Sequence, residues 1–220
     1  IRRDLHQIPE IGLEEYKTHA YLMQVIEGLT ADLDFVEIRT WRTGILVFIK
    51  GSSPDKTIGW RTDIDGLPIV EETGLDFAST HEGRMHACGH DMHTAMLLTA
   101  AKMLKENEDA LCGTVKLMFQ PAEETFEGAR DMLENGLLEN PPVDAALAYH
   151  VAAGKSPVGF VMYNDSGVMM ASVDGFEITV HGRGSHGANP NLAIDPINVG
   201  VHIHLALQEL IARESDPTKT

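Results

Sequence analysis

The chain has 220 residues, 43% of them hydrophobic, which suits one large domain or one domain and part of another. Its 33 acidic and 17 basic residues give a formal net charge of −16. This charge argues against nucleic acid or an anionic membrane as a partner, because both need clustered Lys and Arg. No apolar run approaches the ~20 residues that span a bilayer, and the two cysteines, Cys88 and Cys112, favour a reducing, cytoplasmic compartment.

Strands alternate with helices along most of the chain. Apolar periodicity and turn residues predict helices at 14–29, 94–105 and 127–135, and strands at 36–40, 44–50, 57–61, 113–119 and 144–150. This order predicts an α/β fold, a mixed sheet flanked by helices. Residues 1–7 look like the middle of a helix and 214–220 form a polar stretch after a strong helix, so we expect trimming at both ends.

The pattern changes after Ser166. Residues 172–180 alternate between apolar and polar, as expected of a half-buried antiparallel strand, and 196–213 form a long amphipathic helix. We therefore predict an incomplete catalytic domain at 1–171, followed at 172–220 by the incomplete start of a smaller α+β lid or dimerisation domain.

The polar clusters of the first domain fall where predicted strands end. Ligands of open α/β sheets bind at the carboxyl ends of strands, so segments distant in sequence are expected to share one site there. Cys88 and His90 lie in a Gly-containing turn before a helix, and a thiolate and an imidazole at this spacing can bind zinc. The alternative is a small buried Cys88 among solvated histidines, although His81, His86 and His93 lie close by and weaken it.

Glu123 and Glu124 follow an apolar strand. One could bind a metal and the other could be the general base that activates water; the alternative is an ordinary acidic first turn of a helix. His150 also ends a strand, where a lone histidine is more often structural. Asp63 and Asp65 could bind metal or orient a histidine, or could belong to a solvated turn.

Five motifs in order give the chain a family resemblance that covers nearly all of it. The chain resembles the N-terminal part of the aminoacylase and hippurate-hydrolase family of dinuclear metal amidohydrolases. The matching segments are RDLHQIPE (3–10), RTDIDGLP (61–68), MHACGHDMH (85–93), FQPAEE (119–124) and GRGSHG (182–187).

The resemblance implies a dinuclear site. Cys88 would bridge two divalent metals, with His90, Glu124 and His150 as further ligands and Glu123 as the general base. The metals would be zinc, with manganese, cobalt or nickel as alternatives.

The resemblance assigns supporting roles to three other residues. Asp65 would match the orienting aspartate of the relatives, and Asp63 would support a ligand rather than bind metal itself. His186 would reach across a homodimer to the substrate or the oxyanion. The family's last histidine ligand has no match, and His202 and His204 look like surface or interface residues.

The function implied is hydrolysis of the amide of a small N-acyl amino acid. Residues 41–47 and 59–66 look most like N-acetyldiaminopimelate deacetylases of lysine biosynthesis, whereas 113–125 look more like general aminoacylases. One alternative is a truncated or non-catalytic metal- or ligand-binding protein with a partial site. Another is a thiol redox protein using Cys88, which no Cys-x-x-Cys pair supports.

Overall fold

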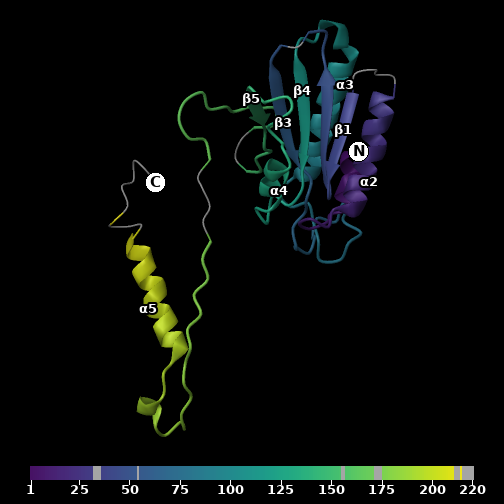
Figure 1. Cartoon of the computed structure of the whole chain (residues 1–220). Helices are drawn as coiled ribbons and strands as arrows, with labels where there is room; N and C mark the ends of the chain where they lie inside the picture. Colours follow the sequence, from purple (N-terminus) through teal and green to yellow (C-terminus); the bar gives the residue numbers. More distant parts are fainter. Residues whose placement is uncertain (32–35, 54, 155–156, 171–174, 211–213, 215–220) are drawn as a thin grey trace. The chain divides into compact units, whose positions relative to one another are not determined.

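The computed structural model describes residues 1–31, 36–53, 55–154, 157–170, 175–210 and 214. The chain divides into two compact units, Ile1–Ser156 and Pro157–Thr220, and each is described by itself (Figure 1). The predicted domain boundary near Ala171 lies outside the described residues, so the limits 1–171 and 172–220 remain a prediction.

The first unit is built on a five-stranded mixed sheet. In spatial order its strands are β1 (Val36–Trp41), β2 (Gly44–Lys50), β4 (Thr114–Gln120), β3 (Thr57–Asp63) and β5 (Ala145–Ala148). β2 is antiparallel to both β1 and β4, whereas β3 is parallel to both β4 and β5. The parallel strands therefore bring their carboxyl ends to one edge.

Helices cover both faces of this sheet, because successive strand residues point to opposite sides. Ile45, Val47 and Ile49 face a core shared with α2 (Tyr16–Thr30) and α3 (His90–Glu106). Leu46 and Phe48 face a second core with α4 (Gly128–Glu134). A short helix, α1 (Arg2–His6), precedes α2. The predicted α/β class with a mixed, helix-flanked sheet is confirmed.

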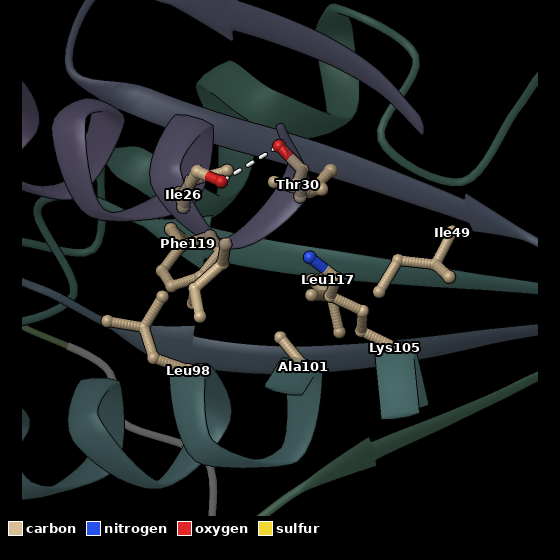
Figure 2. Close-up of a pocket in the computed structure, with 10 residues that line it drawn as sticks. Ile26, Thr30, Ile49, Leu98, Ala101, Lys105, Leu117 and Phe119 are labelled. Carbon is tan, nitrogen blue, oxygen red and sulfur yellow. Dashed lines mark hydrogen bonds between the residues drawn. The ribbon is translucent and has the colours of Figure 1, made fainter. Parts of the chain in front are cut away.

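A small pocket lies between α2, α3 and the sheet (Figure 2). Its lining is almost wholly apolar, and the hydroxyl of Thr30 donates to the carbonyl of Ile26 within α2. Apolar side chains of both helices and of the sheet make up most of the lining, as expected of a gap in the core.

Two boundaries differ from the sequence prediction in ways that affect the site. α3 begins at His90 rather than at residue 94, and Gly89, in a left-handed conformation, is its N-cap residue. β5 ends at Ala148, so His150 follows the strand instead of lying in it.

The second unit contains α5 (Pro196–Glu209) and a β-bridge between Arg183 and Ile194. α5 is capped by Asp195, whose carboxylate accepts from the N–H groups of Ile197 and Asn198. The predicted strand at 172–180 is wrong for its described residues: 175–180 belong to no strand and pair with no neighbour in the described part of the chain. Residues 172–174, and 211–213 of the predicted helix, lie outside the described residues.

Among the described helices, none has the length and apolar character needed to cross a bilayer.

Candidate metal centre

Side chains from four parts of the sequence meet at the carboxyl ends of β3, β4 and β5. Ligand atoms of Cys88, His90 and His150 all lie within 4.8 Å of one another, and so do those of His90, Glu123 and Glu124. His90 belongs to both groups and joins them. The structure therefore brings these five side chains together, and their roles as ligands or base stay predictions.

His90 has one ring nitrogen in use and one free. Nδ1 lies 2.9 Å from the main-chain oxygen of Asp65, which can only accept, so Nδ1 carries the proton. Nε2 is buried without a hydrogen-bond partner, 3.6 Å from Asp63 Oδ2 and 3.8 Å from Glu124 Oε1. A buried imidazole lone pair facing carboxylates is what a metal ion requires of a histidine ligand.

Asp65 accepts hydrogen bonds from two residues of the cluster, His90 and Glu124. Its Oδ1 accepts from His90 Nδ1 at 3.1 Å, and its Oδ2 accepts from the main-chain N–H of Glu124 at 3.0 Å. Glu124 Oε1 is, like His90 Nε2, a buried atom without a hydrogen-bond partner. Two unpartnered ligand atoms that share one orienting carboxylate fit a bound cation.

Charge in the cluster also fits a cation. Burial alone would lower the pKa of His90, but the hydrogen bond that it donates to Asp65 and the charges of Asp63 and Asp65 raise it. The acidic side chains therefore favour positive charge at this point. Arg61 Nη1 lies 2.7 Å from Asp63 Oδ2 and offsets part of this negative charge, and a divalent metal ion would offset the rest.

Cys88 and His150 form the more exposed part of the cluster. Cys88 Sγ lies 3.2 Å from His150 Nε2. Between Cys88 and His90, Gly89 has φ +92°, and a Cβ there would lie 2.5 Å from Val151 Cγ2, so only glycine fits. Burial, and then the charges of the two glutamates, raise the pKa of Cys88 to about 12. The thiol therefore stays protonated until a cation displaces its proton.

Glu123 is one-third exposed, and its Oε2 lies 3.9 Å from His90 Nε2. Burial raises its pKa; the charge of His90 opposes this shift and that of Glu124 adds to it. A carboxylate whose pKa is raised toward neutrality is suited to accept a proton from water and give it up again.

His93 is the residue that sequence reasoning missed. Its Nδ1 lies 2.6 Å from Asp63 Oδ1, and its Nε2 accepts from the main-chain N–H of Val151 at 2.9 Å. Both ring nitrogens are used, so His93 is a support and not a ligand. It holds the backbone beside His150. A helix begun at His90 would have placed His93 on the same face by its i+3 spacing.

Asp63 is buried between two donors, His93 and Arg61, whose Nη1 lies 2.7 Å from Asp63 Oδ2. Burial opposes ionisation, but the hydrogen bond from His93 and the charges of His90 and Arg61 outweigh it and lower the pKa of Asp63 to about 2. Asp63 thus supports the site as an ionised acceptor.

Two further histidines of the first unit, His81 and His86, belong to none of the groups of described residues that could hold a metal ion. His81 contacts the carbonyl of Pro9, and His86 is buried without a hydrogen-bond partner in the described part of the chain. In the second unit, His202 and His204 are exposed on α5. Nδ1 of His186 accepts from the N–H of Ala188 at 3.1 Å, so its Nε2 carries the proton and is the donor.

Comparison with known proteins gives the family. Residues 59–164 match peptidase family M20/M25/M40, and residues 171–219 match the peptidase dimerisation domain. A curated N-acetyldiaminopimelate deacetylase from Streptococcus gordonii is 58% identical over 99% of this chain and 56% of its own length. This chain belongs to the M20 family. It spans about half the length of the curated relatives it matches.

Solved structures agree with this assignment. A protein described as an aminohydrolase from methicillin-resistant Staphylococcus aureus is 37% identical, with a TM-score of 0.74 over 99% of this chain and 56% of that one. A Bacillus subtilis protein described as a dinuclear metal binding peptidase of the M20 family is 42% identical, with a TM-score of 0.63 over 68% of this chain and 41% of that one.

Proposed function

We propose that the protein is a metal-dependent amidohydrolase that cleaves the amide of N-acyl amino acids, with N-acetyldiaminopimelate as the first candidate substrate. The observation that carries the proposal is the buried, unpartnered Nε2 of His90, surrounded by Cys88, His150, Glu123 and Glu124. The curated relatives named N-acetyldiaminopimelate deacetylase support the substrate and with it a place in lysine biosynthesis.

The cofactor proposed is a pair of divalent ions. Cys88 would contact both, and His90, Glu124 and His150 would complete the ligands that this stretch of chain supplies. Thiolate, imidazole and carboxylate together suit zinc, with manganese, cobalt or nickel as alternatives. When bound, the ions polarise the scissile carbonyl and make water a stronger nucleophile at neutral pH.

A side chain of the protein transfers the proton that hydrolysis moves from water to the amide nitrogen. Glu123 takes a proton from the attacking water as the water oxygen bonds to the carbonyl carbon. It then gives this proton to the amide nitrogen as the carbon–nitrogen bond breaks, which releases a carboxylic acid and a free amine. Asp65 keeps His90 and Glu124 in place throughout, through the two hydrogen bonds of its carboxylate.

His186 is proposed as the donor to the carbonyl oxygen that becomes negative during attack. Its hydrogen-bonded Nδ1 leaves the Nε2–H free to donate. The family match of 171–219 to a dimerisation domain supports a homodimer in which this histidine is supplied to the other protomer's site. Both cysteines are free, which supports a cytoplasmic location for a site that needs a thiolate.

The test is a pair of substitutions in the full-length, metal-loaded protein. Glu123→Gln should lower turnover about 10²- to 10⁴-fold while metal content stays at the wild-type level, because a general base is lost and no ligand is. Glu124→Gln should lower metal content as well, because the amide is a poor replacement for an anionic ligand.

The substrate panel should contain N-acetyldiaminopimelate and N-acetyl, N-benzoyl and N-succinyl amino acids, with release of the amine measured directly. Near-normal turnover by Glu123→Gln would show that another group is the base. Metal uptake without hydrolysis of any member of the panel would favour the alternative of a non-catalytic metal-binding protein.

A further inference from the structure

Glu15 is a buried carboxylate that no part of the proposed chemistry uses. It stands at the N-cap of α2, yet its side chain makes no capping hydrogen bond to that helix, which is the usual role of a polar side chain there. The residue is 0% exposed. A carboxylate taken out of water must find donors elsewhere, because an unpartnered buried charge is strongly unfavourable.

The donors come from two distant parts of the chain. Glu15 Oε1 accepts from the main-chain N–H of Ala122 at 2.8 Å, and Oε2 accepts from the Thr43 hydroxyl at 2.6 Å. A longer bond of 3.2 Å from the N–H of Leu13 completes the set. Of these three, the bond to Ala122 reaches the segment that carries Glu123 and Glu124.

Ala122 is an unusual residue for its place. It is fully buried and has φ +47°, a left-handed conformation that residues with a Cβ rarely adopt. Its carbonyl accepts from the N–H of Gly128 at 3.2 Å, so Glu15 and Gly128 hold its two backbone groups. Because Glu123 and Glu124 follow directly, the dihedral angles of Ala122 set the direction in which both side chains leave the end of β4.

Two carboxylates accept hydrogen bonds from the main chain of residues 122–124. Asp65 accepts from the N–H of Glu124, and Glu15 accepts from the N–H of Ala122, two residues earlier. Asp65 also contacts His90, whereas Glu15 contacts none of the proposed ligands. The hydrogen bond that Glu15 accepts from Ala122 N–H is therefore its direct link to the segment that carries Glu123 and Glu124.

We propose that Glu15 is a positioning residue for amide hydrolysis: its carboxylate holds Ala122 in the left-handed conformation that directs Glu123 and Glu124 into the metal cluster. The inference rests on the proposed function for its effect on turnover. Its effect on metal binding rests on the geometry of Glu124 alone.

The first experiment compares Glu15→Leu with Glu15→Gln in the full-length protein. Glu15→Leu removes the acceptor for Ala122 N–H and should weaken zinc affinity about 10- to 100-fold, as loss of a group that orients a ligand does. It should also lower kcat by a similar factor with little change in KM. Glu15→Gln keeps an acceptor oxygen for Ala122 and an amide that can donate to Thr43, and should stay within about threefold of wild type.

Two control variants separate positioning from general damage. Thr43→Val removes the other strong donor to Glu15 and leaves the bond to Ala122 intact, so its zinc affinity should match wild type. Leu22→Ala makes a cavity in the buried face of the same helix, α2, and lowers stability without touching residues 121–124. Zinc affinity is read by competition with a chromophoric chelator, well below the melting temperature of every variant.

The proposal fails if Glu15→Leu binds zinc as tightly as wild type, or if Leu22→Ala loses as much zinc affinity as Glu15→Leu does. It also fails if Glu15→Gln loses as much as Glu15→Leu. If no substrate is hydrolysed by any form, the proposed function is overturned, but the zinc measurements still decide the role of Glu15.

Discussion

Single hydrogen bonds decide what each histidine of the cluster can do. His90 donates from Nδ1 and keeps Nε2 free, whereas His93 uses both nitrogens, one toward Asp63 and one toward Val151. The two rings stand only three residues apart in the sequence, and nothing in the residue type separates them. Their partners make one a candidate ligand and the other a support.

The ionised state of Asp63 predicts a pH dependence of stability. The pKa of Asp63 falls from 3.8 to about 2 on folding, so the folded state favours the carboxylate. The stabilisation is complete above the unfolded pKa and is lost as the pH falls from about 4 to about 2. For Asp63→Asn, measured in chelator, we expect a free energy of unfolding about 2 kcal/mol lower at neutral pH, with the gap to wild type closing over that acid range.

A suitable control is Glu106→Gln, which changes a carboxylate 59% exposed on α3. Its free energy of unfolding should match that of wild type at each pH from neutral downward. A gap between Asp63→Asn and wild type that stays constant between about pH 5 and about pH 2.5 would contradict the expected ionisation.

At the scale of elements, β4 joins the core to the site. Its apolar residues reach both faces of the sheet, and its carboxyl end leads into Glu123 and Glu124. The same strand contains Lys116, which is fully buried and was expected only as part of an apolar strand. Lys116 Nζ donates to the carbonyls of Leu137, Glu139 and Pro141, at 3.0, 2.8 and 3.1 Å. It therefore fixes the chain that follows α4 to the sheet.

Replacing this lysine should destabilise the unit as a whole. We expect Lys116→Met to lower the free energy of unfolding by about 3 kcal/mol, because several carbonyls lose a charged donor and the side chain that replaces it has none. Urea denaturation at neutral pH measures the change. Lys50→Met on β2 is the matched control, since its ammonium is about half exposed and pairs with Glu37 at the surface. Equal effects of the two substitutions would show that the three carbonyls contribute nothing specific.

Two elements of the structure differ from what the sequence pattern predicts. Alternation along 172–180 predicts a strand, but pairing needs a neighbour, and 175–180 have none in the described part of the chain. Apolar periodicity predicts a helix at 94–105, whereas α3 begins at His90, within a polar segment. The structure shows that these polar residues are buried with partners: Asp91 accepts from His6 of α1, and His93 donates to Asp63 at the end of β3. His90 donates to the main-chain oxygen of Asp65.

At the scale of the whole molecule, the proposed ligands link parts of the chain that are far apart. Cys88 precedes α3 and His90 is its first residue, Glu124 follows β4, and His150 follows β5. A cation bound by all of them favours the folded state over the unfolded one, which cannot hold the four groups together. Metal binding and stability should therefore rise together.

We expect excess zinc to raise the melting temperature of the full-length, chelator-treated protein. At a zinc concentration a thousandfold above the dissociation constant, the free energy of unfolding should rise by about 4 kcal/mol. The gain should shrink as the pH falls, because the Cys88 thiol must lose its proton to bind, and burial has raised its pKa. Scanning calorimetry with and without chelator measures the change. His186→Ala should keep the full gain, whereas Glu124→Gln should lose most of it. If His186→Ala abolishes the gain, the division into ligands and substrate-binding residues is wrong.

The sequence by itself determined the fold class, the strand ends where the site lies, and the family, because apolar periodicity and short motifs are local properties of the chain. It also identified Cys88, His90, Glu123, Glu124 and His150, which the structure brings together. Only the tertiary structure decided which atoms are free and which are held. Glu15 and Ala122 are 107 positions apart, and a hydrogen bond between such distant residues exists only once the sheet has folded.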